Sequence, residues 1–114
     1  MNTKPNISFE DYLKADLRIG TVVGAEYIKD NRHLLKLEMD LGFEKRIIVS
    51  AIGDSFSPNV LIGKQLLCLI NIPPREMPEG IISTGIILNS RRSDGCAALA
   101  VFTGEVPRGS TLGS

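Results

Sequence analysis

Net charge and reactive side chains are both scarce in this sequence. Its 114 residues carry 13 basic and 13 acidic side chains and no net charge, so any surface that attracts nucleic acid must be local. The 2 cysteines, Cys68 and Cys96, have neither the spacing of a metal or redox motif nor the density of a disulfide scaffold. Both lie in apolar runs, which predicts reduced cysteines in the core.

A membrane anchor is missing as well. No run approaches the roughly 18 consecutive apolar residues that cross a bilayer. Residues 1–6 lack the apolar core of a signal peptide. We therefore expect no membrane association and a cytoplasmic location.

Signatures of catalysis are absent too. The sequence contains neither a Walker phosphate-binding loop nor a G-x-S-x-G motif, and its acidic residues occur mostly at exposed alternating positions. The one histidine, His33, would have to lie beside a cysteine to form a metal site or a nucleophile pair. The sequence thus favours a binding module that is not an enzyme and needs no metal or cofactor.

What the sequence does contain is a series of short strand patterns. Apolar residues at 35, 37, 39 and 41 alternate with charged ones, which indicates a half-buried strand. Residues 44–52 return as its hairpin partner, and we expect Ile47, Val49 and Ala51 inside and Arg46, Ile48 and Ser50 outside. Residues 17–28 are rich in β-branched side chains and contain two glycines, as the bends of a small barrel require.

The remaining elements complete a small all-β domain. Ser8 is a good N-cap for a short helix over residues 8–15, and Ser57-Pro58 begins one helical turn before a buried strand. About five strands at short spacing follow from these patterns. The prediction is a single domain over residues 1–114, a five-stranded Greek-key OB-fold barrel with a short N-terminal helix.

The segment Ile70-Asn-Ile-Pro-Pro-Arg-Glu76 ends the buried strand in an unusual way. Pro73 and Pro74 cannot donate ladder hydrogen bonds and make the path stiff, so Asn71 and Arg75 are held in nearly fixed positions. Amide and guanidinium groups suit phosphate and ribose hydroxyls. The alternative is that Asn71 caps the strand end while Arg75 pairs with a nearby acid, Glu76 or Glu79.

Six stretches, in order and over nearly the whole chain, resemble the stand-alone tRNA-binding domain of the methionyl-tRNA synthetase β-subunit type. They are "ADLRIGTVVGAE" (15–26), "LKLEMDLG" (35–42), "IIVSAIGDSFSPNVLIGKQ" (47–65), "NIPPRE" (71–76), "GIISTGIIL" (80–88) and "VPRGSTL" (106–112). The form "NIPPRE" is most similar to the CsaA branch. The resemblance implies an OB-fold homodimer that binds tRNA by shape, and its CsaA members are also described as export-related chaperones.

The resemblance also implies site residues. The family's loop "PNADKL" aligns on residues 29–34, where Arg32 and His33 replace its Asp-Lys pair. Asp54 stands where many members carry lysine, which argues for a weaker or differently placed basic surface. The positions that match RNA-binding positions of the family are Arg32, His33, Ser50, Asn71, Arg75 and Ser83.

Two further features leave alternatives open. Arg91 and Arg92 lie in a polar loop that either reaches phosphates or is simply solvated.

The expected outer face of residues 36–50 carries no aromatic side chain on which bases could stack, which favours recognition of a folded RNA through its backbone. The rival function is a chaperone that binds extended peptides beside Ile72 and Met77, and a third possibility is a tether between RNA and a tRNA synthetase.

The last expectation concerns assembly. Phe9, Tyr12 and Leu13 form an apolar stripe on a helix too short to be stable unless that stripe is buried. It either packs on its own barrel or forms a homodimer interface with the C-terminal segment, residues 106–112. Because a neutral small domain presents few phosphate contacts, two copies would bind a large RNA more tightly.

Overall fold

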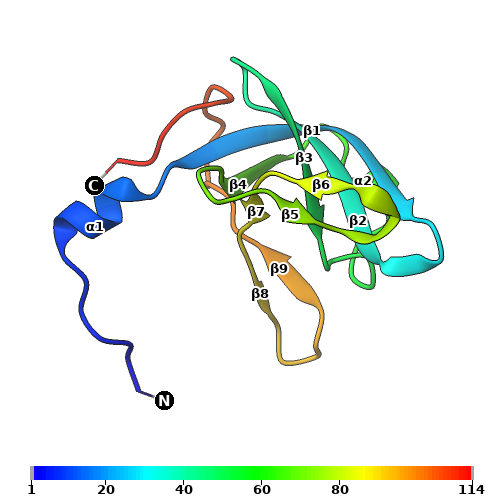
Figure 1. The fold of residues 1–114 in the computed structure, drawn as a ribbon, viewed down its shortest axis with the longest axis horizontal. Helices are drawn as coiled ribbons and strands as arrows, with labels where there is room; N and C mark the ends of the chain where they lie inside the picture. Colours follow the sequence, from blue (N-terminus) through cyan, green and yellow to red (C-terminus); the bar gives the residue numbers. More distant parts are fainter. Residues whose placement is uncertain (1, 114) are drawn as a thin grey trace.

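The computed structural model describes residues 2–113, and short strands account for most of its regular structure (Figure 1). The elements in chain order are α1 (Phe9–Lys14), β1 (Leu17–Ile28), β2 (Asn31–Asp40), β3 (Lys45–Ser50), α2 (Pro58–Leu61), β4 (Gln65–Leu69), β5 (Arg75–Glu76), the 3₁₀ turn η1 (Pro78–Gly80), β6 (Ile82–Ser83), β7 (Ile86–Ile87), β8 (Asn89–Arg91) and β9 (Ala97–Leu99). The expected short helix is present, with the Ser8 hydroxyl accepting a hydrogen bond from the Asp11 N–H at 3.0 Å.

The main sheet has five antiparallel strands in the order β3-β2-β1-β4-β7. The first three strands form a meander, and β4 returns beside β1. This order is the predicted Greek key. The all-β prediction is therefore confirmed.

The ladder does not close into a continuous barrel. Between β3 and the segment before β7, the Thr84 N–H donates to the Ile47 carbonyl at 2.9 Å and the Val49 N–H donates to the Ser83 hydroxyl at 2.9 Å. Strands β6 and β7 are separated by Thr84 and Gly85. Gly85 packs so closely that a Cβ there would lie 2.8 Å from Ile48 Cδ1 and 2.9 Å from the Leu69 carbonyl oxygen.

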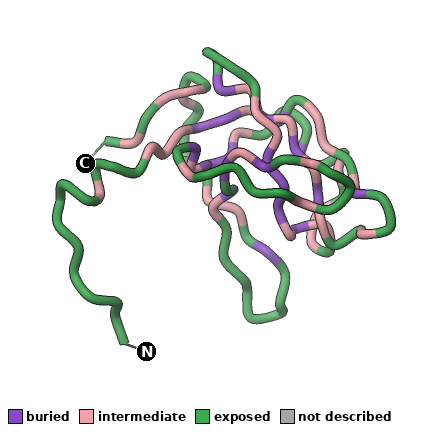
Figure 2. Tube along the Cα trace, in the orientation of Figure 1, coloured by how far each residue is buried: buried purple, intermediate pink, exposed green. Residues whose placement is uncertain are grey.

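The hydrophobic core lies inside the curled sheet, under β1, β2 and β4 (Figure 2). Leu35, Leu37, Met39 and Leu41 are each 0% exposed, as the alternation of β2 predicts. Each such side chain contributes roughly 1.5–3 kcal/mol when fully buried. The core therefore fixes which face of β2 points inward.

The inward face of β3 was predicted wrongly. Ile48 is 0% exposed and Ser50 is 8% exposed, whereas both were expected outside. The cause is register: Ile48 lies opposite Leu37, and Ser50 opposite Leu35, and directly opposed residues of an antiparallel pair share a face. Val49 is buried as expected, but Ile47 and Ala51 are only half-buried, so β3 approaches burial on both faces near its end.

The two cysteines differ, and one expectation fails. Cys68 is buried in β4, where burial raises the pKa of its thiol to about 11. Cys96 is a free, exposed thiol. It precedes β9 in the turn of the β8–β9 hairpin, where its N–H donates to the Asp94 carboxylate. Burial begins only at the next residue, Ala97, which is 4% exposed.

The N-terminal helix projects away from the sheet (Figure 1), and its last residues lie beside Thr111 and Leu112. None of its residues is buried; Phe9 and Leu13 are each 60% exposed. Of the two expected positions for its apolar stripe, packing on its own barrel is not observed. Within residues 2–113 no helix is both long and apolar enough to cross a bilayer.

Candidate nucleic-acid interface

The two ends of β1 carry different surfaces. We call the β1–β2 turn with its surroundings, residues 27–33, 51–56 and 91–92, the loop end. The opposite end, formed by α1, residues 16–18, Asn71 and residues 108–112, we call the helix end. The two lie at opposite sides of the molecule in Figure 1.

The loop end begins with a tight turn that fixes Arg32 and His33. Asp30 has a left-handed backbone with φ 59°, and the Asn31 carboxamide accepts a hydrogen bond from the His33 N–H at 3.2 Å. The turn is held from outside by Gly53, whose N–H donates to the His33 carbonyl at 3.0 Å. Only glycine fits at 53, because a Cβ there would overlap the Arg32 carbonyl oxygen.

The side chains of the turn then point in different directions. The guanidinium carbon of Arg32 lies 4.2 Å from the centre of the Tyr27 ring, a cation–π distance. The His33 ring is paired through Nδ1 with the Asp54 carboxylate. Asp54, which replaces a common lysine of the family, therefore lies against His33 and not against Arg32.

The β8–β9 hairpin brings Arg91 to the same end. Its guanidinium donates to the Ala51 carbonyl at 2.7 Å, and the Ala97 N–H donates to the Ser55 hydroxyl at 2.7 Å. These bonds attach the hairpin to the 51–56 loop. Arg92 pairs with Asp94 of the same hairpin at 3.3 Å, so the bond to the 51–56 loop comes from Arg91.

Arg75 lies on the β5–β6 hairpin, whose second strand packs against β3. It is exposed, stands opposite Ser83, and donates to the Gly85 carbonyl at 3.3 Å. It forms no ion pair with Glu76 or Glu79 in the described part of the chain. The acid partner that the alternative interpretation required is therefore not observed.

Ser83 and Ser50 lie beneath this surface. Ser83 is 0% exposed; its hydroxyl accepts from Val49 N–H and donates to the Gly85 carbonyl. Ser50 lies on the inner side of β3, opposite Leu35. Both serines are thus placed to support β3, β6 and the segment that carries Arg75.

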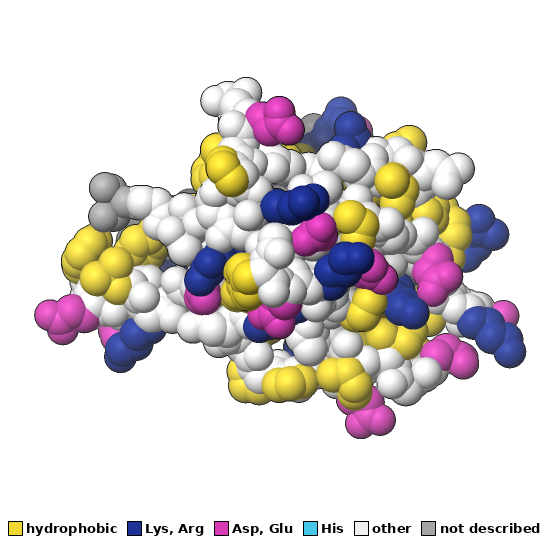
Figure 3. All heavy atoms as spheres, turned by 90° about the horizontal axis from the view of Figure 1, so that it is seen from above, with side chains coloured by type: hydrophobic (Ala, Val, Ile, Leu, Met, Phe, Trp, Pro, Cys, Tyr) yellow, Lys and Arg dark blue, Asp and Glu magenta, His cyan; other side chains and the backbone are white. Residues whose placement is uncertain are grey.

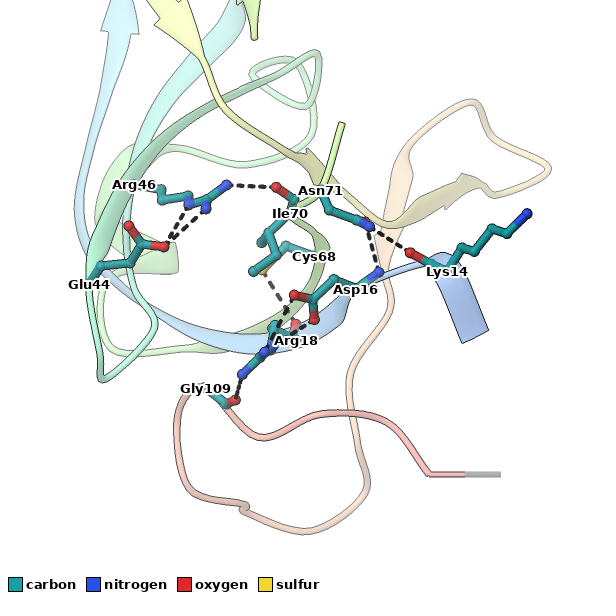
Figure 4. Close-up of polar contacts among 9 residues, drawn as sticks. All are labelled: Lys14, Asp16, Arg18, Glu44, Arg46, Cys68, Ile70, Asn71 and Gly109. Carbon is teal, nitrogen blue, oxygen red and sulfur yellow. Dashed lines mark hydrogen bonds and ion pairs between the residues drawn. The ribbon is translucent and has the colours of Figure 1, made fainter. Parts of the chain in front are cut away.

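Asn71 lies at the helix end, away from the other predicted site residues. Its carboxamide oxygen accepts from the Asp16 N–H at 2.8 Å and its nitrogen donates to the Lys14 carbonyl at 2.5 Å (Figure 4). The Ile70 N–H also donates to the Asp16 carbonyl. Asn71 therefore joins the end of the β4 segment to the link between α1 and β1.

Arg46 is a structural residue that sequence reasoning placed on the outer face. Its guanidinium donates to the Ile70 carbonyl at 2.6 Å and to the Thr84 carbonyl at 3.1 Å, and it pairs with Glu44 (Figure 4). The start of the proline segment is thus bonded on one side by Arg46 and on the other by Asn71. The stiffness expected from two prolines is reinforced by these two side chains.

Basic and acidic side chains are interspersed over the surface in Figure 3, while hydrophobic ones gather over the projecting N-terminal helix. Seven of the 13 basic residues have a carboxylate partner, namely Lys14, Arg18, Lys36, Lys45, Arg46, Arg92 and Arg108. Within residues 2–113 the other six have none, namely Lys4, Lys29, Arg32, Lys64, Arg75 and Arg91. Three of these six, Lys29, Arg32 and Arg91, lie at the loop end.

The sequence of this chain matches one described protein family. The tRNA binding domain family (tRNA_bind) matches residues 17–111, from the first residue of β1 to the strand-like segment that follows the last hairpin. The chain belongs to the tRNA binding domain family. The tRNA-binding domain predicted from six short stretches is thereby confirmed.

Relatives of this tRNA-binding domain are found among much longer enzymes. It is 40% identical over 109 residues to a methionine–tRNA ligase of Phocaeicola vulgatus, and the match covers 96% of this chain but 16% of that enzyme. A methionine–tRNA ligase of Cytophaga hutchinsonii is 38% identical over 110 residues, with the same 16% share. The chain therefore spans about one sixth of the length of these relatives.

Two solved structures of proteins of about this chain's length share the fold of this tRNA-binding domain over nearly the whole chain. A MetRS-related protein from Pyrococcus horikoshii is 31% identical with a TM-score of 0.87, covering 96% of this chain and 99% of that one. The chaperone CsaA from Bacillus anthracis is 31% identical with a TM-score of 0.85, covering 96% and 100%. Both branches named by the sequence resemblance are thus represented.

Sequence reasoning missed two members of the loop end, Lys29 and Tyr27. Tyr27 lies within the strand pattern of residues 17–28, and nothing local indicates that its ring meets Arg32. Their contact depends on the β1–β2 pairing, where Tyr27 lies opposite Leu35 and Ile28 opposite Asn31. Knowledge of the β1–β2 register would have been needed to predict that Tyr27 and Arg32 meet.

Proposed function

We propose that this domain binds folded tRNA, without catalysis of its own, through the exposed cations of the loop end and Arg75. The observation that carries the proposal is the group Lys29, Arg32, Arg75 and Arg91, which have no carboxylate partner in the described part of the chain. Guanidinium groups suit phosphate oxygens. Membership of the tRNA binding domain family supports tRNA as the ligand.

Within this proposal the predicted site residues have two kinds of role. Arg32, His33, Arg75 and Arg91 are exposed and are assigned to the RNA surface, with Arg92 at its margin. Ser50 and Ser83 are assigned to positioning, because their side chains lie beneath that surface. Asn71 is assigned to the link between the proline segment and α1, because both of its amide groups are already bonded there.

Binding should depend only moderately on salt. Three or four phosphate contacts would give a log–log slope of binding against salt of about −3. The test is a titration of total tRNA and of a single-stranded DNA of equal length at several salt concentrations. Preference for tRNA supports recognition of a folded RNA, and equal affinity for the two would refute it.

Arg75→Ala is the variant that tests the surface directly. We expect tRNA binding to weaken by about 1–3 kcal/mol, the range for a charge-assisted contact, with unchanged thermal unfolding. Lys45→Ala is a matched control, because that exposed lysine pairs with Glu38 and lies outside both the loop end and the helix end. Equal effects of the two variants would show that Arg75 has no particular role.

We also propose that two copies bind tRNA together as a homodimer. The support is the uncovered apolar side of the N-terminal segment, where Ile7 is 70% exposed and Phe9 and Leu13 are each 60% exposed. Beside it is a hollow of about 380 Å³, lined among others by Leu13, Asn71 and Leu112. Two symmetry-related copies of such a surface can cover one another.

Light scattering at micromolar concentration tests the dimer. The wild type should have twice the mass of one 12.4 kDa chain, and Leu13→Glu should shift it to a monomer, because a buried unpaired charge is costly. A monomeric wild type that binds tRNA tightly would contradict the two-copy proposal.

A synthetase partner is the natural extension of this function. Curated relatives are whole methionine–tRNA ligases in which the matched region is a small part. We propose that the domain delivers tRNA to such an enzyme in the cytoplasm. Capture of a synthetase from lysate with the tagged domain, and its loss after nuclease treatment, would show an association through RNA, and persistence would show direct contact.

Peptide binding is the second candidate function, and a groove favours it. A hollow of about 500 Å³ between β3 and the proline segment is lined by Ile47, Ile72, Pro74 and Ile82 among others. An extended apolar peptide fits beside a strand in such a groove, and a CsaA chaperone shares the fold. Peptide binding that persists at a salt concentration where tRNA binding is lost would favour this function.

A further inference from the structure

At the loop end the Arg32 guanidinium stacks on the aromatic ring of Tyr27. The guanidinium carbon of Arg32 lies over the Tyr27 ring, 4.2 Å from its centre. Tyr27 is half-buried and packs against the hydrophobic core, so its ring has a fixed backing. One face of the guanidinium is covered by the ring, while the arginine as a whole is exposed.

The backbone beneath this stack is also held in place. Gly53 N–H and Asn31 Oδ1 both bond to the backbone of the residue that follows Arg32. The neighbouring carboxylate of Asp54 is paired with His33, and within residues 2–113 Arg32 has no carboxylate partner of its own. Arg32 is therefore a planar, charged group on a rigid support with an open face.

Planar groups of this kind bind nucleobases in single-stranded or looped RNA, where unstacked bases pack on aromatic rings or guanidinium planes. We propose that the Tyr27–Arg32 stack is a platform for one unpaired nucleobase of the bound RNA. Lys29 and Arg91, which belong to the same loop end, would then meet phosphates near that nucleotide. This inference rests on the proposed function and adds a base-stacking subsite to its backbone contacts.

Arg32→Lys tests the platform, because lysine keeps the charge and loses the plane. The probes are an RNA hairpin with a single-stranded loop and a fully paired RNA duplex of equal phosphate count. We expect the wild type to bind the hairpin about tenfold more tightly, a modest value for one stacked base. Arg32→Lys should lose that preference, because its affinity for the hairpin falls by more than its affinity for the duplex. Arg75→Lys is the matched control, and it should affect both RNAs equally.

A fluorescent base gives a second readout that folding defects do not mimic. With 2-aminopurine placed in turn at each loop position, one position should be quenched by the wild type and not by Arg32→Lys. Retained hairpin preference or retained quenching in Arg32→Lys, or no hairpin preference in the wild type, would overturn the platform and leave the proposed function standing. A wild type that binds neither RNA nor tRNA would overturn both.

Discussion

The helix end and the loop end use their polar side chains differently. At the helix end, Asp16, Arg18 and Asn71 are bonded to this same chain: Arg18 pairs with Asp16 at 2.7 Å and donates to the Gly109 carbonyl at 3.0 Å (Figure 4). At the loop end, Lys29 and Arg32 face solvent with no carboxylate partner among residues 2–113. The first end holds segments of chain together, and the second leaves positive charge available for a ligand.

Apolar side chains are exposed at the helix end and covered at the loop end. The helix end exposes Phe9 and Leu13, whereas the tyrosine of the loop end is backed by the core and covered by Arg32. A neutral chain can therefore expose one apolar surface and, at its other end, one positively charged surface. Local arrangement, not net charge, is what distinguishes them.

The largest losses of stability are expected from two glycine variants, one of which disrupts the loop end and the other the helix end. In Gly53→Ala the new methyl group overlaps the Arg32 carbonyl, and in Gly109→Ala it overlaps the Leu41 carbonyl. Gly109 in addition has a left-handed backbone, with φ +83°. We expect each to lower the free energy of unfolding by about 3 kcal/mol, from overpacking of backbone and, at 109, left-handed strain.

Chemical denaturation measures both glycine variants, and tRNA binding separates them. Among the molecules that remain folded, Gly53→Ala should bind tRNA poorly but keep the wild-type oligomeric state. Gly109→Ala should lose the dimer and keep the tRNA affinity of a single copy. If Gly53→Ala also loses the dimer, the two ends are not independent.

Alkaline pH should weaken the region beneath the helix end next most strongly. The Cys68 thiol bonds to the Arg18 carbonyl at 3.4 Å, and burial raises its pKa to about 11 from the model-compound value of 9.0. The unfolded chain loses this proton first as pH rises, so stability is full below about pH 9 and falls toward pH 11, by about 2–3 kcal/mol at most.

Unfolding measured from pH 7 to 11 in wild type and Cys68→Val checks this. The variant should lack the part of the decline that the thiol causes. A thiol reagent at neutral pH offers a control: Cys96 at the hairpin should react at once and Cys68 only on unfolding. Two fast thiols in a folded protein would contradict the burial of Cys68.

Ser83→Ala should reduce stability by about 1–3 kcal/mol, the cost of leaving the buried Val49 N–H without a partner. Because Ser83 supports the segment that carries Arg75, we also expect weaker tRNA binding. Thermal unfolding and a tRNA titration measure the two effects. Ser90→Ala on the exposed β8 strand is the control; an equal loss of stability there would show that the buried hydroxyl has no special role.

Asn71→Ala should have the smallest effect on stability, about 1 kcal/mol, because its two hydrogen bonds are exposed to solvent. Loss of these bonds frees the link to α1, so the dimer should weaken at dilute concentration. Light scattering over a concentration series tests this. If a dimeric Asn71→Ala protein binds tRNA much less well than the wild type, Asn71 contacts the RNA after all.

Several features could be predicted because they depend on local pattern. The short helix follows from the Ser8 cap and the inner face of β2 from strict alternation. Errors arose where a neighbour decided the outcome. Ile48 and Ser50 face inward because of the residues opposite them on β2, and Cys96 is exposed because a hairpin turn precedes β9.

By itself, then, the sequence determined the all-β class, the Greek-key strand succession and the membership of a tRNA-binding family. These depend on the order of apolar periods, turn residues and short motifs along the chain. Only the tertiary structure decided that Asn71 joins α1 while Arg75 stays exposed, and that Arg32 covers Tyr27. The physical reason is that hydrogen bonds and stacking depend on which strands lie opposite one another, and strand register brings together residues that sequence spacing does not relate.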